Sequence, residues 1–404
     1  MAGVVITGLG AVSALGPDVQ SLRAGLRAGR DGIGPLMLFE YRGRSTVAAE
    51  APDVTAEWPL PAATVRRLSR PDRFALVAAG EAIAAAGLDR RTLRSTAVVV
   101  GATTGGMFET ESSYRDWRAG AASTLRTSRV LGTSLATSGA AVAQAFGAYG
   151  PQETASTACS SSALAIARAA EMIETGRAAV AVALGTDGLC RLTYAGFDAL
   201  QALDPERCRP FDRERRGLTL GEGAGALVLE DAAHARARGA RTVARLLGWG
   251  TATDAHHPTA PHPEGRGAVV ALRYALAMAR LAPRDVDYVN AHGTGTPQND
   301  AVEAAVLRAI FGDELARIPV SSTKSQIGHT LGAAGALEAV VTAIALADAV
   351  LPPTLGLREA DPSWAGVDLV TAPGRAAALR AAVSSSYGFG GHNVTLALGR
   401  SEPA

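Results

Sequence analysis

The chain has 404 residues, and because a single hydrophobic core rarely exceeds about 250–300 residues, we expect two core-bearing units. Apolar residues make up 48 % of the sequence and charged residues 19 %, a composition that excludes a disordered protein. The formal net charge of +1 provides no field that would attract a polyanion, so the charge balance argues against nucleic acid as a partner.

The chain contains three cysteines, an odd number that does not indicate a disulfide framework, so a cytoplasmic location is expected. We find no run of about 18 strongly apolar residues and therefore expect no membrane span. The first ten residues lack the basic region and the long apolar run of a signal peptide.

Short apolar runs alternate with alanine-rich stretches of helical period along the first half of the chain. They predict strands at 4–6, 97–100, 179–184 and 225–229, and helices at 74–86 and 160–175. The second half repeats the pattern, with strands at 286–289, 318–320 and 382–385 and helices at 301–311 and 335–346. This alternation predicts an α/β fold with a mostly parallel sheet, in two similar layered halves that join near 241–250.

A glycine loop at 8–10 follows the first predicted strand and suggests a dinucleotide site. Ser13 stands where the third glycine of that fingerprint belongs, and Asp31, the next acid in range, lies in a loop. The segment 221–225 is likewise interpreted as a turn into a strand, so we predict no nucleotide cofactor.

Cys159 is the candidate nucleophile, at the start of the predicted helix 160–175. The N-terminus of a helix carries partial positive charge and free N–H groups, which lower a thiol pKa and can bind an oxyanion. An inert buried cysteine is the alternative, and this stretch alone does not separate the two. The competing thiols are Cys190 and Cys208; the latter has an arginine on either side, in a segment that we interpret as an exposed loop.

Two histidines, His292 and His329, stand in glycine loops that follow predicted strands, where α/β sheets place their active sites. A neutral imidazole can donate its N–H to an oxygen on which negative charge develops, although a structural role is open for either residue alone. His256, His257 and His262 form a third group. No ligand spacing completes a metal site there, so we interpret it as a pocket rim or a solvated loop.

Lys324 is the only lysine among 39 basic residues, and all the others are arginine. A lysine that survives such a bias is a candidate for a role that a planar guanidinium cannot fill, although one residue can also remain by chance. A last glycine loop, at 387–391, follows a predicted strand and permits close approach of the backbone to a substrate.

Together these segments resemble the β-ketoacyl-acyl-carrier-protein synthases, the elongating type II enzymes of the thiolase superfamily. The matching motifs are T-A-C at 157–159, N-A-H-G-T-G-T-P at 290–297, S-T-K-S-Q-I-G-H-T-L-G-A-A-G at 322–335 and S-Y-G-F-G-G-H-N at 386–393. They occur in the family's order across nearly the whole chain. The resemblance implies a five-layered α-β-α-β-α fold of two thiolase-like halves, residues 1–245 with the cysteine and 246–404 with the histidines, the lysine and the glycine loop.

The resemblance also implies an activity, the decarboxylative Claisen condensation of an acyl thioester with malonyl-acyl-carrier-protein by an acyltransferase. Cys159 would carry the acyl chain as a thioester, and His292 and His329 would stabilise the enolate formed when carbon dioxide is lost. Lys324 would hydrogen-bond within this group, with Glu338 as its carboxylate partner.

Further roles follow from the same resemblance. The backbone N–H groups of Cys159 and Phe389 would form the oxyanion hole, and Phe389 would also act as a gate. Thr294 and Thr296 would hold the pantetheine arm, and Phe197 would contact the substrate. Neither a metal nor a free cofactor is implied, since the substrates are carried on the phosphopantetheine of an acyl carrier protein.

The local sequences at 185–192 and 254–265 are similar to those of ketosynthases from aryl-polyene and highly reducing type II polyketide pathways. Tyr387 stands where the family usually has phenylalanine. The alternatives are a housekeeping fatty-acid elongation synthase II and a carrier-protein-binding partner subunit without elongation activity. A cysteine hydrolase is disfavoured, because no residue that would orient a Cys–His pair is identifiable.

The resemblance implies two protein partners. One is an acyl carrier protein, for which Arg66, Arg67 and Arg70 are candidate docking residues because carrier proteins are acidic. The other is a second protomer bound at the sheet edge of the first half. We expect a heterodimer with a cysteine-less chain-length factor, and a homodimer is the alternative.

Overall fold

The computed structural model describes residues 3–55, 58, 60–125 and 127–401. Its strands are β1 (Val4–Val12), β2 (Gly34–Pro35), β3 (Val47–Ala48), β4 (Ala97–Gly101), β5 (Gln152–Ala155), β6 (Val180–Asp187), β7 (Gly223–Asp231), β8 (Ala244–Thr253), β9 (Tyr288–Asn290), β10 (Val320–Ser321), β11 (Val350–Leu351), β12 (Arg375–Ala376), β13 (Ala381–Gly388) and β14 (His392–Arg400). Its helices are α1 (Val19–Ala28), α2 (Ala62–Val65), α3 (Arg70–Ala86), α4 (Arg90–Ser95), α5 (Met107–Arg118), α6 (Thr127–Leu131), α7 (Ala136–Phe146), α8 (Ser161–Glu174), α9 (Arg191–Ala199), α10 (Ala232–Ala237), α11 (Arg266–Ala279), α12 (Pro297–Phe311), α13 (Lys324–Ile327) and α14 (Ala334–Asp348).

The main sheet contains an internal repeat of five strands. Its strand order is β10-β9-β13-β14-β8-β1-β7-β6-β4-β5, which divides into two sets of five. We number the five strands of each set by their order in the chain. In both sets the strands then lie across the sheet in the order first, fifth, fourth, second, third. The directions match as well: in both sets the fourth–second and second–third pairs are parallel, and the first–fifth and fifth–fourth pairs are antiparallel. The two sets meet through a short antiparallel pairing of β1 with β8.

The sheet is therefore mixed, and the prediction of a mostly parallel sheet is wrong. The spacing of apolar residues in a sequence distinguishes strands from helices, but it carries no information on the direction of a strand. Within each set, the last strand returns antiparallel to its predecessor, as β7 does beside β6 and β14 beside β13.

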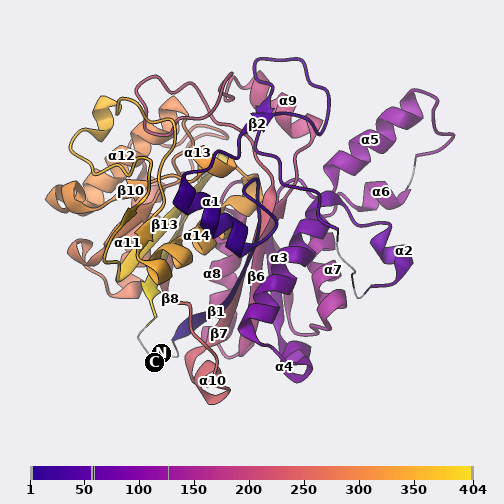
Figure 1. Cartoon of the computed structure of the whole chain (residues 1–404), viewed down its shortest axis with the longest axis horizontal. Helices are drawn as coiled ribbons and strands as arrows, with labels where there is room; N and C mark the ends of the chain where they lie inside the picture. Colours follow the sequence, from indigo (N-terminus) through magenta and orange to yellow (C-terminus); the bar gives the residue numbers. More distant parts are fainter. Residues whose placement is uncertain (1–2, 56–57, 59, 126, 402–404) are drawn as a thin grey trace.

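The two strand sets and the helices on their faces form the predicted five layers (Figure 1). Helices α3 and α7 pack on the outer face of the first set, and α11 and α12 pack on that of the second. Helices α8 and α14 lie between the two sets, where the largest core cluster joins residues of both halves. The thiolase-like fold class predicted from the sequence is confirmed, while the division of the chain between residues 245 and 246, inside β8, stays a prediction.

The central helices approach one another and the sheet closely because glycines stand at the crossings. A Cβ atom on Gly335 of α14 would lie 2.6 Å from the backbone nitrogen of Ala163 in α8. A Cβ on Gly185 of β6 would lie 2.3 Å from the Cβ of Ser162. The contact of Gly335 sets where the N-terminus of α8 lies relative to the second half, and that of Gly185 sets how close it lies to β6.

The predicted helices and strands are present, with shifts at their ends, but the loop predicted at 8–10 is wrong, because these residues lie inside β1. Strands β9 and β10 each lie one or two residues later than predicted, and α12 begins at Pro297 rather than at 301, with proline in the first turn, where its missing N–H costs nothing.

One long apolar segment was not expected. Leu331–Asp348 has a mean hydropathy of 1.6 over 18 residues, enough by length and composition to cross a membrane. The segment is not a continuous apolar run, since it contains Glu338 and Asp348. Because 89 % of the segment is buried inside the protein, it forms the core helix α14 and the turn before it.

Candidate active site

Cys159 lies in a strained turn at the start of α8. Ala158, directly before it, has φ 51°, a left-handed conformation that is unfavourable for a residue with a Cβ. The Ser161 hydroxyl holds the turn: it donates to the Ala158 carbonyl at 2.6 Å and accepts from the Thr157 N–H at 2.8 Å. The thiol is thereby fixed at the entrance to the helix, and Cys159 is only 6 % exposed.

Burial raises the pKa of Cys159 to about 11, although the charge of Lys324 and a hydrogen bond from the Phe389 N–H act in the opposite direction. The expected lowering of this pKa is therefore wrong in net effect, because the loss of hydration outweighs the favourable groups. The same hydrogen bond brings the C-terminal glycine loop onto the sulfur of Cys159.

His292 follows β9 and is held by groups on two other elements. The N–H groups of His292 and Gly293 donate to the two carboxyl oxygens of Glu303 at 2.7 and 2.8 Å. The ammonium of Lys324 donates to the His292 carbonyl at 2.7 Å and lies 3.3 Å from its ring Nδ1. It also forms a buried ion pair with Glu338 of α14.

His329 completes the group from the turn before α14. Its ring lies 5.4 Å from that of His292, at an interplanar angle of 87°. Burial, followed by the charge of Lys324, lowers the pKa of both histidines well below the usual value. Both imidazoles are therefore neutral at pH 7, and each keeps one N–H for donation.

A cavity of about 390 Å³ joins these groups. Cys159, His292 and His329 line it together with Thr294, Thr296, Phe197 and Phe389. The rings of Phe197 and Phe389 stack at 5.5 Å, and the two threonine hydroxyls lie 2.9 Å apart. The structure thus brings together the candidate residues that the sequence scattered over both halves, with Glu338 and Lys324 directly behind them.

The third histidine group lies near this cavity but does not form a metal site. Asp254 and residues 259–261 of the same loop line the cavity, whereas His256 and His257 are exposed. Among the described residues, no cluster of three or more histidine, cysteine or acidic side chains is placed to hold a metal ion.

Two expectations about single residues are wrong. Cys208 is fully buried rather than in an exposed loop: its sulfur contacts the Lys324 carbonyl, and burial raises its pKa to about 11. Arg70 is not available for docking, since its mostly buried guanidinium pairs with the buried Glu222 and with Asp53. Arg66 and Arg67 are exposed.

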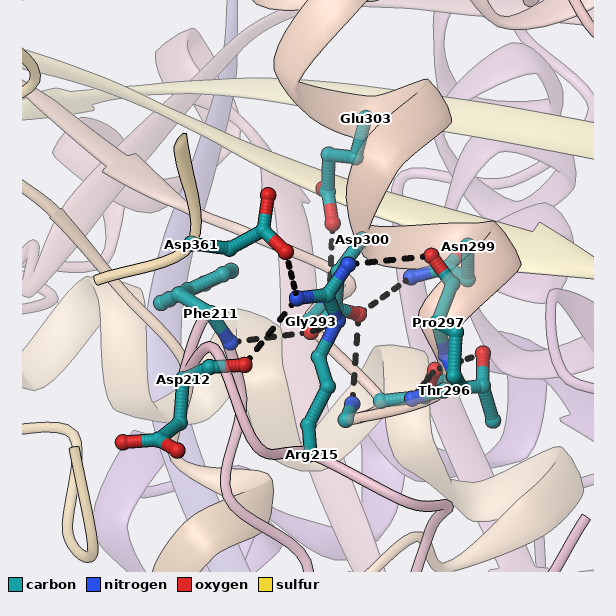
Figure 2. Close-up of polar contacts among 12 residues, drawn as sticks. Phe211, Asp212, Arg215, Gly293, Thr296, Pro297, Asn299, Asp300, Glu303 and Asp361 are labelled. Carbon is teal, nitrogen blue, oxygen red and sulfur yellow. Dashed lines mark hydrogen bonds and ion pairs between the residues drawn. The ribbon is translucent and has the colours of Figure 1, made fainter. Parts of the chain in front are cut away.

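Sequence reasoning missed the carboxylates that hold the His292 loop. Figure 2 shows Asp300 and Glu303, one helical turn apart on α12. Asp300 accepts hydrogen bonds from the N–H groups of Phe211 and Gly295, and the buried Arg215 lies beside it. The D-x-x-E spacing that begins two residues after T-P was the available signal, because it places both side chains on the face of the helix that meets the loop.

Comparisons with known proteins agree with this geometry. Residues 1–235 match the family model "Beta-ketoacyl synthase, N-terminal domain", and residues 243–358 match "Beta-ketoacyl synthase, C-terminal domain". The chain is 37 % identical to 3-oxoacyl-[acyl-carrier-protein] synthase 2 of Synechocystis sp., covering 98 % of this chain and 97 % of that protein. It is 40 % identical to putative polyketide beta-ketoacyl synthase 1 of Streptomyces halstedii, over the same shares of the two chains.

Among solved structures, the ishigamide ketosynthase/chain length factor superposes with a TM-score of 0.92 at 33 % identity, covering 99 % of this chain and 100 % of that one. The matches extend over both halves of the fold. The chain therefore belongs to the β-ketoacyl synthase family of acyltransferases.

Proposed function

We propose that this enzyme extends an acyl chain by two carbons, by decarboxylative condensation of an acyl thioester with malonyl-acyl-carrier-protein. One observation carries the proposal: a buried thiol, an N–H donor aimed at it and two neutral imidazoles line one cavity. The thiol suits acyl transfer, and the imidazoles suit the stabilisation of an enolate.

Acyl transfer comes first. The sulfur of Cys159 attacks the carbonyl carbon of the acyl-pantetheine thioester, and the N–H groups of Cys159 and Phe389 receive the developing oxyanion. The carbon–sulfur bond to pantetheine breaks, and the departing thiolate takes the proton that Cys159 loses. Burial raises the pKa of Cys159 to about 11, so the residue is a thiol before the substrate binds.

Decarboxylation follows. The bond between the malonyl carboxylate and the α-carbon breaks, carbon dioxide leaves, and its bonding electrons form an enolate. N–H groups of the neutral His292 and His329 donate to the thioester oxygen as it becomes negative. The ammonium of Lys324, neutralised by Glu338, orients His292 through its carbonyl and its ring nitrogen.

Condensation closes the cycle. The α-carbon of the enolate attacks the Cys159 thioester, and the tetrahedral intermediate expels the Cys159 thiolate. The products are the 3-oxoacyl thioester and a thiolate that takes one proton from water. Thr294 and Thr296 hold the pantetheine arm, the only prosthetic group that the reaction needs, and Phe389 against Phe197 gates the cavity.

We place the enzyme in a polyketide pathway rather than in housekeeping fatty-acid synthesis. Its segments at 185–192 and 254–265 support this, and so does its similarity to a ketosynthase/chain length factor and to a putative polyketide synthase. The similarity to 3-oxoacyl-[acyl-carrier-protein] synthase 2 keeps the fatty-acid alternative open to test.

We further propose an acyl carrier protein as the donor of both substrates, with Arg66 and Arg67 meeting its acidic surface, and a cytoplasmic location. The second protomer would pair along β5, the edge strand of the first set, and would be a cysteine-less chain-length factor.

Intact-protein mass spectrometry tests the chemistry. After incubation with a carrier protein that bears an acyl group, the mass of the enzyme should rise by one acyl group. Addition of malonyl carrier protein should then remove this acyl group from the enzyme as a 3-oxoacyl product. The variant Cys159→Ala should gain no acyl mass while still releasing carbon dioxide from malonyl carrier protein. Acyl mass on that variant would overturn the assignment of Cys159, and peptide mapping would locate the true nucleophile.

A further inference from the structure

Asp187, a residue with no role in the reaction described above, lies at the structural counterpart of the active site. It ends β6, as Gly388 ends β13, the matching strand of the other set. In the second half, the segments after β9 and β13 supply His292 and Phe389. In the first half, the segment after β4 supplies Thr103, and the last residue of β6 is Asp187.

The carboxylate of Asp187 is completely buried and is satisfied by donors from both halves. One oxygen accepts from the N–H of Thr104 at 2.7 Å and from its hydroxyl at 2.8 Å. The other accepts from the N–H of Gly332 at 2.7 Å, and the N–H of Thr103 lies 3.0–3.1 Å from both oxygens. Backbone N–H groups and a hydroxyl thus take the place of a cationic partner.

Two of these donors, Thr103 and Gly332, each lead to one reacting group. The hydroxyl of Thr103 donates at 3.2 Å to the carbonyl of Ala158, the strained residue directly before Cys159. Gly332 lies in the turn between His329 and α14, and a Cβ there would come within 2.5 Å of the Asp187 carboxylate and 2.6 Å of the Thr103 hydroxyl. The contact is therefore tight, and it joins the turn of the nucleophile to the turn of a histidine from the opposite half.

We propose that Asp187 is a positioning residue that fixes Cys159 and His329 relative to each other for the condensation step. The proposal rests on the function proposed above. Acyl transfer needs the thiol and its oxyanion donors, and decarboxylation needs the histidines. Only condensation needs the thiol and the histidines to be correctly placed relative to each other. Burial raises the pKa of Asp187, and its carboxylate in turn raises the pKa of Cys159, so what the residue contributes is geometry rather than activation of the thiol.

The test compares Asp187→Asn with the wild-type enzyme in three assays: acyl transfer to Cys159, decarboxylation of malonyl carrier protein and complete condensation. The asparagine NH₂ group would face the N–H of either Thr104 or Gly332. Because two donors cannot form a hydrogen bond, the contact is lost and the two turns move apart. We expect acyl transfer and decarboxylation to stay within about threefold of wild type and condensation to fall about 100-fold, the loss typical of a 1 Å misplacement.

Two further variants complete the design. Thr103→Val removes only the hydroxyl that reaches Ala158, on an exposed side chain of similar size, and should give the same pattern with a smaller loss. Glu81→Gln changes another carboxylate that holds two backbone N–H groups, those of Ala11 and Val19, and should leave all three rates unchanged.

The outcomes separate the two proposals. Equal losses in all three assays, or a condensation rate that is unchanged in both Asp187→Asn and Thr103→Val, would overturn the positioning role. A wild-type enzyme that performs neither partial reaction would instead overturn the proposed function. Thermal melting of each variant measures how much of any loss comes from unfolding.

Discussion

Lys324 shows at the scale of one residue why a compact ammonium is needed in this site. Its side chain is 2 % exposed, and Nζ reaches a backbone carbonyl, an imidazole nitrogen and a carboxylate within one buried space. An ammonium can point three N–H groups in three directions, whereas a guanidinium is planar and larger. The solitary lysine of an arginine-rich chain thus stands where arginine does not fit.

The variant Lys324→Arg keeps the charge but should displace His292. We expect the barrier to condensation to rise by about 2–4 kcal/mol, the typical cost of losing one oriented electrostatic group. Turnover measured with acyl and malonyl carrier proteins checks this, with the surface change Arg27→Lys as the control. Turnover near the wild-type level would mean that Lys324 is only the last lysine left.

The histidines give a prediction about pH. Burial and the Lys324 charge lower the pKa of His292 and His329 well below the usual value, so acidification from pH 8 to pH 6 does not protonate them. Decarboxylation by Cys159→Ala should therefore have the same rate across this range. A rate that follows a single titration near pH 6.5 would show that an ordinary, hydrated imidazole does the chemistry.

At the scale of elements, the crossing of α8 and α14 determines the site. Cys159 and His329 stand at the entrances to these two helices, and their separation depends on how closely the helices pack. Gly335 makes the close approach possible, because a Cβ there would lie 2.6 Å from the backbone of Ala163 and 2.8 Å from its Cβ.

The variant Gly335→Ala should therefore destabilise the protein by about 1–3 kcal/mol, the usual cost of overpacking a core. Condensation should fall further than the folded fraction does, since the helices carry the reacting groups. The matched control is Gly196→Ala in α9, where the new methyl group meets nothing within 4 Å and a helix gains a better helix former. Chemical denaturation of both variants measures the difference, and equal stabilities would contradict the packing argument.

At the scale of the whole molecule, we expect the second protomer, proposed above to pair along β5, to contact the outer surface of α5 and α6 as well. These helices extend away from the layers in Figure 1 and expose large apolar side chains, Tyr114 at 49 %, Trp117 at 41 % and Leu131 at 67 %. Clusters of exposed aromatic and aliphatic side chains are typical of protein interfaces.

We expect the protein expressed alone to be poorly soluble or a weakly active homodimer, and a cysteine-less homologue to co-purify with it one to one. Co-expression, sizing of the complex and product analysis with malonyl carrier protein and reducing enzymes measure this. A stable homodimer that makes full-length product alone would refute the heterodimer and leave the chemistry at Cys159 intact.

The sequence by itself determined the fold class, the repeat of two halves and the main candidate residues. Period 2 and period 3.6 patterns locate strands and helices because they follow from which side chains must be buried. Glycine loops and the motifs around Cys159, His292, Lys324 and His329 are local, so they are readable without the fold.

Only the tertiary structure decided how these pieces work together. Strand direction, the burial of Cys208 and the engagement of Arg70 by Glu222 depend on contacts between segments that are far apart in the chain. The raised pKa of Cys159 has the same origin, because the helix N-terminus is a local feature and loss of hydration is not. Asp187 likewise carries no motif of its own, since its partners Thr104 and Gly332 become neighbours only when the two halves pack together.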